Sequence, residues 1–472
     1  MDPRNLQELA AACGGELRGG PSAVLVRRIT TDSRDAAPGD LFVALSGERF
    51  DGHDFLSSVA SQGASAAMVS RSKTSAIPAG LPVIVVENCR EAFGRLAAAY
   101  RRDFDIPVVC VAGSNGKTTT KELIAAVLGA AFPTLRSSAS FNNDVGVPAT
   151  LLRLESGHRA AVLEAGTNHP GELAPLVRMI APRIGVLTSI GREHLEFFGN
   201  LEGVVDEEGW LPELLPSAEQ GGVLVLPGSM PQSLDLIRRT RARVVRVGLG
   251  SGNDWQAGIR AMDWSGTTFS VRSPHDGWNG EYTMILPGRH SVVNALFALV
   301  VARELGVDAA LAREGLAGFQ PAPRRLNLLA AAGVDILDDT YNANADSMLA
   351  ALQTLSDLPC SGRRVAVLGD MAELGAHAEA SQEEVGRAAA RLEMDAVFAV
   401  GRRALVTATA AGVGRGRAFP DVGTAAAAVI HYVRAGDAVL VKASRSSGLE
   451  RIVAAMVKQL ELREAARMPG AL

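Results

Sequence analysis

One stretch of the chain places glycine, lysine and hydroxyl side chains at a spacing that can bind an anion. It is Gly113-Ser114-Asn115-Gly116-Lys117-Thr118-Thr119, and it joins an apolar run, PVVCVA, to an apolar pattern with helical spacing, KELIAAVLGAAF. A glycine turn between a strand and a helix directs backbone N–H groups and the positive end of the helix toward one point. There Lys117 can reach a nucleotide phosphate, and the Thr118 hydroxyl can bind Mg²⁺. Val111 stands where the strict P-loop pattern has glycine, so we interpret the segment as a GSNGKTT variant rather than an ordinary glycine-rich turn.

Two further candidates for cation binding follow apolar runs. AAVLEAG places Glu164 at the end of one predicted strand, and IGVLTSIGREHLEFFG places His194 just beyond another. The carboxyl ends of parallel strands meet at one edge of a sheet, so we expect both residues near the GSNGKTT loop. Mg²⁺ prefers oxygen ligands, so the carboxylate suits it better than the imidazole. For His194 a capping or core role is the open alternative.

Several polar residues in predicted turns have both a binding and a structural interpretation. They lie in TTDSR, GERFDGHDF and SFNNDVGV, and they are Ser33, Arg34, Gly47, Asp51, Gly52, His53, Asn142 and Asn143. The donors among them suit a phosphorylated substrate, but Asp, Ser, Asn and Gly also favour turns without any ligand. His290 and Asn294 share one helical face. Either this face contacts a nucleotide base, or His290 is a helix cap.

The elements that position these residues indicate an α/β protein with three domains. Residues 1–104 combine short apolar strands with helices. Residues 105–320 alternate strands and helices, which predicts a mostly parallel sheet covered on both faces, with strands PVVCVA, AAVLEAG, IGVLTSI, GGVLVLP and ARVVRVG. Residues 321–472 repeat this arrangement as a Rossmann-like unit, in which we expect Ser347 to cap the helix that follows TYNANADS.

Composition argues against several classes of function. The 472 residues carry a net charge of −4, so neither nucleic-acid binding nor a membrane-surface role is indicated. No apolar run is long enough to span a bilayer, and the N-terminal residues lack the pattern of a signal peptide. The four cysteines lie far apart, without the spacing of a disulfide frame or a zinc site. We therefore expect a cytoplasmic protein without membrane insertion, and we expect a monomer.

Together the motifs resemble those of the Mur ligase family of ATP-dependent amide-bond synthetases, over nearly the whole chain. The resemblance rests on TDSR, GDLFVALSGERFDGHDF, GSNGKTTTKE, FNNDVGVPATLL, GELAPLVRMIAP, IGREHLEFFG, PGRHSVVNAL, DDTYNANADSM, VLGDMAELG and LVKASR. DDTYNAN and LGDMAELG favour the member that joins D-alanyl-D-alanine to UDP-N-acetylmuramoyl-tripeptide through an acyl phosphate. The alternatives are another amide ligase of this architecture, such as a folylpolyglutamate or cyanophycin-type synthetase, and a non-catalytic protein that binds ATP and a UDP-sugar.

The resemblance implies a role for each matching residue. The catalytic residues would be Lys117, Glu164, His194 and Arg325. ATP would contact Gly113, Ser114, Asn115, Gly116, Lys117, Thr118, Thr119, His290, Asn294, Arg325 and Asp339, and Mg²⁺ would bind Thr118, Glu164 and His194. The uridine diphosphate would contact Ser33, Arg34 and the loop 47–55. The dipeptide would lie near Tyr341, Asn342, Asn344 and Asp370.

One departure from the family pattern concerns the metal site. In these ligases a lysine modified to a carbamate usually binds a second Mg²⁺, and alignment of GREHLEFFGNLEGVVDEEGW places Glu208 at that position. The chain has no lysine between Lys121 and Lys442. Glu208 carries a carboxylate on a shorter side chain, so we hypothesise that it replaces the carbamate. The alternatives are a weak second metal site and a solvated acidic turn that includes residues 206 and 207.

Overall fold

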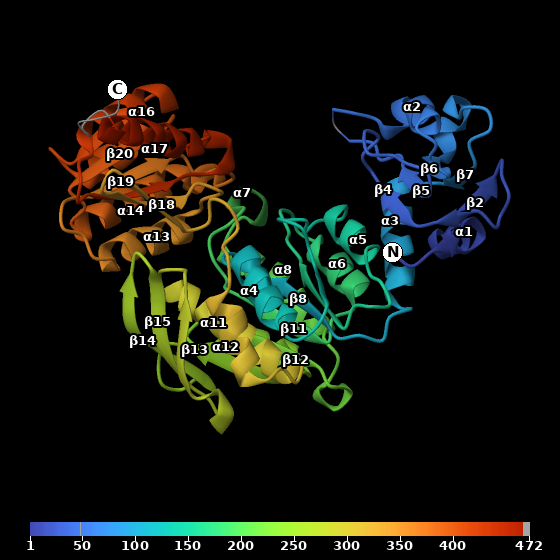
Figure 1. Cartoon of the computed structure of the whole chain (residues 1–472), viewed down its shortest axis with the longest axis horizontal. Coiled ribbons are helices and arrows are strands. Elements are labelled where there is room, and N and C mark those ends of the chain that lie inside the picture. The colour runs from blue at the N-terminus through green and yellow to red at the C-terminus, as the bar shows by residue number, and fades with distance from the viewer. Residues whose placement is uncertain (48, 466–472) are drawn as a thin grey trace.

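The chain forms an α/β fold of three units, each built on its own sheet. The computed structural model describes residues 1–47 and 49–465. The two end units lie on the same side of the central one (Figure 1). The predicted fold class and the mostly parallel sheets are confirmed, while the domain boundaries after residues 104 and 320 remain a prediction. Within the described ranges, no helix has both the length and the apolar character that a bilayer crossing requires.

The N-terminal unit is a five-stranded sheet in the order β2-β7-β6-β5-β4. Strands β4 to β7 pair in parallel, and β2 adds an antiparallel edge. The strands are β2 (Glu16–Arg18), β4 (Arg28–Thr30), β5 (Asp40–Val43), β6 (Ala66–Ser70) and β7 (Val83–Val86), and β1 (Arg4–Asn5) pairs separately with β3 (Leu25–Val26). The helices are α1 (Leu6–Cys13), α2 (Leu56–Ser61) and α3 (Cys89–Arg101).

The central unit is a nine-stranded sheet in the order β16-β15-β14-β13-β12-β11-β8-β10-β9. From β8 the chain first builds β9 and β10 on one side and then crosses to β11 on the other. This reversal opens a crevice beyond the carboxyl end of β8, which is where such sheets bind ligands. The strands of this part are β8 (Val108–Ala112), β9 (Thr134–Arg136), β10 (Ala160–Glu164), β11 (Ile184–Leu187), β12 (Val223–Pro227) and β13 (Arg243–Gly248).

Alternate residues of β8 face opposite layers of helices, because side chains alternate along a strand. Val109 and Val111 pack in a core with α4 and α11, whereas Val108 and Cys110 pack in another with α3 and α6. The first core continues into the C-terminal unit, and the second continues into the N-terminal unit. The helices are α4 (Lys117–Gly129), α5 (Gly146–Leu151), α6 (Leu173–Ile180), α7 (Leu195–Phe198), α8 (Leu201–Glu208), α9 (Trp210–Leu214), α10 (Ser233–Arg239), α11 (Arg289–Glu304) and α12 (Ala309–Ala317).

Three strands at the edge of the central sheet were not predicted from the sequence. They are β14 (Trp255–Asp263), β15 (Gly266–Arg272) and β16 (Gly280–Met284). β14 pairs in parallel with β13, and β15 and β16 follow as antiparallel neighbours. The α/β alternation therefore ends at β13, and the sheet closes with a meander that lies below the C-terminal unit in Figure 1.

The C-terminal unit is a six-stranded sheet in the order β17-β18-β22-β19-β20-β21. Five strands are parallel, and β17 pairs antiparallel with β18. The strands are β17 (Asn327–Ala331), β18 (Val334–Asp339), β19 (Arg364–Gly369), β20 (Ala396–Val400), β21 (Gly416–Phe419) and β22 (Ala438–Lys442). The helices are α13 (Ala345–Asp357), α14 (Ala378–Arg391), α15 (Ala404–Ala411), α16 (Val422–Tyr432) and α17 (Glu450–Ala465).

The prediction that Ser347 caps α13 is wrong. Asn344 is the N-cap, and its side chain accepts the N–H of Ser347. The Ser347 hydroxyl in turn accepts the N–H of Asn344 at 3.0 Å. Both residue types satisfy N–H groups at a helix start, so only the position at which the backbone becomes helical distinguishes the cap from its partner.

Candidate active site

The phosphate loop connects β8 to α4. Gly116 is the N-cap of α4 with φ 84°, a left-handed conformation that favours glycine, and it offers no capping side chain. The loop is held by Ser189, which accepts the N–H of Ser114 at its carbonyl oxygen and the N–H of Asn115 at its hydroxyl, both at 2.9 Å. The first N–H groups of α4 are therefore directed at an open loop, as an anion site requires.

Lys117 is folded over this loop. Its Nζ donates to the carbonyl oxygen of Gly113 at 2.5 Å and lies 3.5 Å from Glu193 Oε2. Burial lowers the pKa of Lys117, but the carboxylates of Glu193, Glu208 and Glu164 raise it, and the net shift is upward. The side chain is therefore a positive charge at neutral pH, positioned to neutralise a phosphate.

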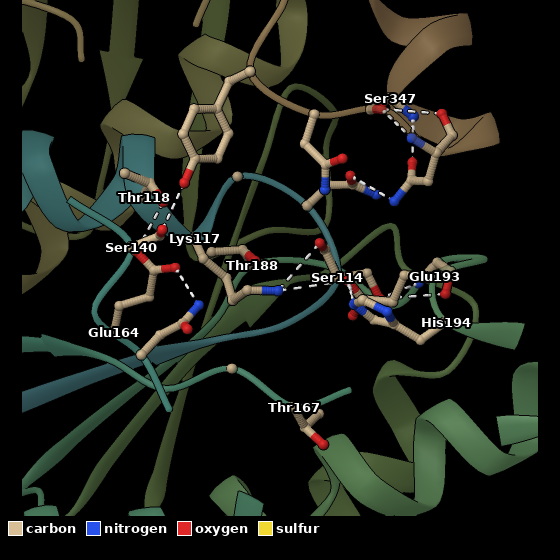
Figure 2. Close-up of a pocket in the computed structure, with 18 of the residues that line it drawn as sticks. Ser114, Lys117, Thr118, Ser140, Glu164, Thr167, Thr188, Glu193, His194 and Ser347 are labelled. Atoms are coloured by element: carbon tan, nitrogen blue, oxygen red, sulfur yellow. Dashed lines mark hydrogen bonds and ion pairs between the residues drawn. The ribbon is translucent and has the colours of Figure 1, made fainter. Parts of the chain in front are cut away.

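A hydroxyl and a buried carboxylate meet beside the loop. Thr118 Oγ1 donates to Glu164 Oε2 at 2.8 Å, and Asn142 Nδ2 donates to Glu164 Oε1 at 2.9 Å. Figure 2 shows Thr118, Glu164 and Ser140 on one side of Lys117. Glu193 and His194 lie on the other side. Glu164 thus lies at the end of β10 beside the phosphate loop, as the sequence predicts.

His194 precedes α7 and links two units. It has φ 48°, an uncommon left-handed conformation for a residue other than glycine. Its Nδ1 lies 2.6 Å from Glu373 Oε2 of the C-terminal unit, and its Nε2 lies 4.0 Å from Glu193 Oε2. The imidazole therefore lies between two carboxylates at the mouth of the phosphate site.

Three consecutive acidic residues end α8 in different environments. The Asp206 side chain is 86% exposed. Glu207 is buried and accepts the N–H groups of Gly171 and Leu173 at 2.8 and 2.7 Å, which ties α8 to the start of α6. Glu208 is fully buried, and neither carboxylate oxygen has a hydrogen-bond partner in the part of the chain that the structure describes. A solvated acidic turn is therefore the wrong interpretation for Glu208.

The surroundings of Glu208 disfavour its ionised form. Burial raises the pKa of Glu208 to about 8, a shift that Lys117 opposes and Glu193 reinforces. A buried carboxylate without hydrogen bonds is costly unless a positive charge approaches it. The residue is therefore a candidate cation ligand in the layer beneath the phosphate loop.

The nucleoside candidates lie on the first turns of α11. A Cβ added at Gly116 would come within 3.0 Å of Asn294 Oδ1, so this buried amide packs directly against the phosphate loop. Burial lowers the pKa of His290, so its imidazole is neutral at physiological pH. A neutral imidazole and an amide on one helical face suit a nucleotide base.

The C-terminal unit contributes an aromatic ring flanked by cations. The guanidinium carbons of Arg325 and Arg445 lie 4.0 and 5.9 Å from the ring centroid of Tyr341. The Tyr341 hydroxyl pairs with Ser140 Oγ of the central unit at 2.6 Å. The Tyr341 ring therefore holds the Arg325 guanidinium in place. Its hydroxyl connects the C-terminal unit to the central unit.

Asp339, predicted to contact the ribose, pairs with Lys442, for which the sequence indicates no role. Lys442 is buried, and its Nζ donates to Asp339 Oδ2 at 2.6 Å and to the carbonyl oxygen of Asn342 at 2.9 Å. Lys442 belongs to the LVKASR motif, but only the parallel pairing of β18 with β22 places it beside Asp339.

One cavity of about 1700 Å³ joins most of these side chains. The predicted residues that line it are Ser114, Asn115, Gly116, Lys117, Thr118, Thr119, Asn142, Asn143, Glu164, His194, His290, Asn294, Arg325, Asp339, Tyr341, Asn342 and Asn344. Arg49 and Arg90 reach it from the N-terminal unit. The cavity therefore draws on all three units.

The remaining predicted residues do not line this cavity. In the N-terminal unit they are Ser33, Arg34, Gly47, Asp51, Gly52 and His53; Glu48, in the same loop, lies outside the described residues. Asp51 accepts His53 Nδ1 at 2.6 Å, and the Arg34 side chain, 87% exposed, pairs with Asp32. These contacts are those of ordered turns, and a ligand role for the group stays a prediction.

Three further predicted residues also lie outside the cavity lining. Gly113 is the first residue of the phosphate loop but does not line the cavity, and Glu208 is buried. The Asp370 carboxylate accepts the backbone N–H groups of Arg402 and Arg403 at 2.8 and 3.1 Å. Its observed contacts therefore hold a turn of the C-terminal unit together.

The oxygen donors around Thr118 fit a magnesium ion. A hydroxyl paired with a buried carboxylate matches the preference of Mg²⁺ for oxygen, and the buried Glu208 supplies a further carboxylate without hydrogen bonds. Across residues 1–47 and 49–465, no three Asp, Glu, His or Cys side chains form a ready-made metal site. A cation here would therefore depend on hydroxyl and substrate oxygens as well.

Known proteins resemble this chain over almost its full length. The Mur ligase family catalytic domain matches residues 25–101, the Mur ligase middle domain matches residues 111–302, and the Mur ligase glutamate ligase domain matches residues 324–445. The chain is 37% identical to the UDP-N-acetylmuramoyl-tripeptide–D-alanyl-D-alanine ligase of Escherichia coli, over 96% of this chain and 98% of that protein.

Two crystal structures extend the likeness to three dimensions. One is MurF from Acinetobacter baumannii, with a TM-score of 0.88 and 31% identity over 97% of this chain and 99% of that one. The other is MurF from Thermotoga maritima in complex with ADP, with a TM-score of 0.81 and 28% identity over 93% and 99%. With three matched domains in the same order and a full-length relative above 30% identity, this chain belongs to the Mur ligase family.

Proposed function

We propose that this chain joins D-alanyl-D-alanine to UDP-N-acetylmuramoyl-tripeptide and uses ATP to do so. One observation carries the proposal: a single cavity joins the phosphate loop to cationic side chains of both end units. A reaction with one nucleotide and two further substrates that each carry a carboxylate needs such a shared chamber. The Escherichia coli relative, aligned over nearly its whole length, is named for the same reaction.

The chain's side chains fit an acyl-phosphate route. ATP transfers its γ-phosphoryl group to the terminal carboxylate of the tripeptide, ADP leaves, and the dipeptide amine then displaces phosphate to form the amide. Charge develops on the moving phosphoryl oxygens, and Lys117 of the central unit and Arg325 of the C-terminal unit supply positive charge in the same cavity. His290 and Asn294 would orient the base, and Asp339, held by Lys442, would receive the ribose.

Magnesium is the cofactor that we propose for this site. Thr118 and Glu164 would hold it, with His194 at the mouth and Glu208 as an additional carboxylate in place of the family's modified lysine. When bound, Mg²⁺ neutralises phosphate oxygens and the developing charge. Within the chain, a hydrogen bond from Asn142 keeps the Glu164 carboxylate oriented, and the Glu373 carboxylate faces the imidazole of His194 at 2.6 Å.

An acyl phosphate must be kept from water, and the contacts between units serve that end. Ser140 pairs with Tyr341 at 2.6 Å, and Asn344 Nδ2 donates to Asn115 Oδ1 at 3.0 Å. Both contacts join the central unit to the C-terminal unit at the rim of the cavity. A chamber closed in this way disfavours hydrolysis relative to transfer to the amine.

The alternatives have less support. A folylpolyglutamate- or cyanophycin-type synthetase does not account for the N-terminal unit, whose match begins at residue 25. A non-catalytic protein does not account for a charged Lys117 next to a paired Thr118 and Glu164. Because the reaction consumes ATP, we propose a cytoplasmic location, and because the cavity draws only on units of one chain, we propose a monomer.

The direct test is to identify the product. Purified protein is incubated with ATP, Mg²⁺, UDP-N-acetylmuramoyl-tripeptide and D-alanyl-D-alanine, and the mixture is analysed by mass spectrometry. We expect the mass of the tripeptide substrate plus the dipeptide minus water, and we expect no such product from Lys117→Met. Absence of the product with the unsubstituted protein would contradict the proposal.

A further inference from the structure

Arg192 makes a dense set of contacts between the central and C-terminal units. Its guanidinium donates to Asp346 Oδ1 from Nε and Nη2 at 3.1 and 2.7 Å, and to Glu384 Oε2 from Nη1 at 2.6 Å. Its backbone N–H donates to Asp346 Oδ2 at 2.7 Å. Asp346 lies in the first turn of α13 and Glu384 lies on α14, so one side chain of the central unit contacts two helices of the C-terminal unit.

The segment that carries Arg192 also supports the phosphate loop. This segment, residues 189–194, accepts the N–H groups of the loop at Ser189. Gly191 N donates to Ser114 Oγ at 2.8 Å, and Glu193 lies 3.5 Å from the Lys117 ammonium. Arg192 therefore lies between two residues that contact the loop, and it directs its own side chain away from the loop to the C-terminal unit.

The start of α13 contacts both the phosphate loop and segment 189–194. Its N-cap, Asn344, donates to Asn115 of the phosphate loop at 3.0 Å. A Cβ added at Gly191 would come within 2.7 Å of Asp346 Oδ2, so the Asp346 carboxylate lies against the backbone of Gly191 because residue 191 has no side chain. The phosphate loop, segment 189–194 and the α13 N-terminus thus form one hydrogen-bonded group.

We propose that Arg192 is a positioning residue, which holds the C-terminal unit against the phosphate loop while the acyl phosphate awaits the dipeptide amine. Arg192 acts through Asp346 and Glu384 and not by contact with the reacting atoms. Its forked pairs are charge-assisted hydrogen bonds, which fix orientation as well as distance. The three side chains are 34–38% exposed, so added salt screens the attraction. The kinetic part of this inference rests on the proposed function, and the structural part does not.

The structural part is tested without substrates. Small-angle X-ray scattering of the full chain at low salt compares the unsubstituted protein, Arg192→Ala and the control Arg238→Ala. Arg238 pairs with Asp235 at 2.9 Å on the surface of α10, so its loss removes an arginine–carboxylate pair within a single unit. At low salt we expect a larger radius of gyration for Arg192→Ala than for the other two proteins. Addition of 0.5 M salt should also increase the radius of gyration of the unsubstituted protein. An unchanged radius for Arg192→Ala would overturn the proposal, even if the protein proved to have no ligase activity.

The kinetic part separates docking from general damage. Loss of one or two kcal/mol of docking energy corresponds to a factor of about 5 to 30, and we expect the KM for the dipeptide to rise by that factor in Arg192→Ala. The KM for ATP should rise with it, because Arg325 and Asp339 belong to the same unit, while the KM for the UDP-linked substrate, whose uridine diphosphate is assigned to the N-terminal unit, stays near its original value. Phosphate release should exceed amide formation, because an undocked unit leaves the acyl phosphate open to water. Arg192→Lys, which keeps the charge but loses the fork, should recover part of the loss.

A double-variant comparison identifies the partner. If Arg192 acts through Glu384, the effects of Arg192→Ala and Glu384→Ala on the dipeptide KM overlap, and the double variant resembles the stronger single one. Effects that multiply independently, or a dipeptide KM that is unchanged in Arg192→Ala, would overturn the proposal. Should Arg192→Ala fail to fold, Glu384→Gln weakens the same contact more mildly and carries the same expectations.

Discussion

Glu207 and Glu208 are neighbours of the same type with opposite environments. Glu207 accepts two backbone N–H groups and holds the start of α6, whereas Glu208 is buried without a hydrogen-bond partner in the described structure. A carboxylate with such partners has a structural role. One without them costs stability unless a cation neutralises it. This contrast is the structural basis for proposing Glu208, and not Glu207, as the additional magnesium ligand.

A Glu208→Gln variant tests this assignment by cation binding. The melting temperature is followed during a Mg²⁺ titration with a non-hydrolysable ATP analogue, because a ligand that binds only the folded state raises it. We expect the variant to need about 10- to 100-fold more Mg²⁺ than the unsubstituted protein for the same rise. Asp206→Asn removes an exposed carboxylate two residues away and should behave like the unsubstituted protein. Identical titrations for Glu208→Gln and the unsubstituted protein would show that Glu208 is no ligand.

Side chains whose role depends on local geometry were predictable from the sequence. Thr118 and Glu164 lie together because each follows a strand of the same parallel sheet. Arg192 and Lys442 were not predictable in this way, since their partners are up to 192 and 103 residues away in the chain. Apolar periodicity does not specify which exposed or half-buried cations meet across units.

At the scale of elements, α4 is tied to the loop that carries Ser140 and Asn142. Lys121 is fully buried in α4, and its Nζ donates to the carbonyl oxygens of Ser137 and Ala139 at 2.8 and 2.5 Å. The same loop supplies the contacts with Glu164 and with the C-terminal unit. The helix that begins at the phosphate loop therefore also positions the opposite wall of the site.

Replacing Lys121 by methionine should destabilise the central unit. The variant leaves the carbonyl oxygens of Ser137 and Ala139 without their shared donor, while Glu122 keeps its second partner, Arg136. Loss of such hydrogen bonds at a buried position typically costs about 1–3 kcal/mol. Urea unfolding followed by tryptophan fluorescence measures this, because Trp210, Trp255, Trp264 and Trp278 all belong to the central unit. Lys458→Met, on the exposed face of α17, makes the same chemical change and should stay within about 0.5 kcal/mol. Equal effects of the two substitutions would contradict this role for Lys121.

Asp437 holds the strands β19 and β22 at their starting ends. It accepts the backbone N–H groups of Arg363 and Arg434, both at 2.9 Å, and Arg363 Nη2 at 2.7 Å. Burial raises the pKa of Asp437, but the hydrogen bonds from Arg363 and Arg434 lower it by more. The pKa therefore lies below the ordinary value of 3.8. A carboxylate with a lowered folded pKa stabilises the fold above its unfolded pKa and loses that contribution as pH falls through the folded value.

The Asp437→Asn variant should therefore lose stability in a pH-dependent way. At pH 7 we expect a loss of about 1–3 kcal/mol, because the asparagine amide cannot replace a carboxylate that accepts several N–H groups. The difference from the unsubstituted protein should stay constant between pH 7 and pH 5 and shrink below about pH 3.8. Melting temperatures from circular dichroism across this range provide the measurement. A difference that grows as the pH falls would contradict the assigned direction.

Elements with strong apolar patterns were predictable, and those defined by non-local pairing were not. PVVCVA is buried on both faces, so β8 follows from its sequence alone. β14 has one face exposed over much of its length and depends on its pairing with β13 and β15. β9 and β21 are only three and four residues long, too short to establish a period.

At the scale of the whole molecule, each face of the central sheet supports one end unit. The core beneath α4 and α11 continues into α13 and α14, and the core on the opposite face continues into the N-terminal unit through α3. The phosphate loop lies at the end of the sheet between these two attachments. Both end units therefore line the same cavity, so a movement of either one would change its shape.

The most direct test of this account is phosphate release with single substrates omitted. Purified protein with ATP and Mg²⁺ receives the UDP-linked tripeptide, D-alanyl-D-alanine, both or neither, and phosphate is measured together with the amide product. We expect rapid release only with both substrates present, with one phosphate for each amide bond formed. Phosphate release that is equally fast without the tripeptide or without the dipeptide would contradict it.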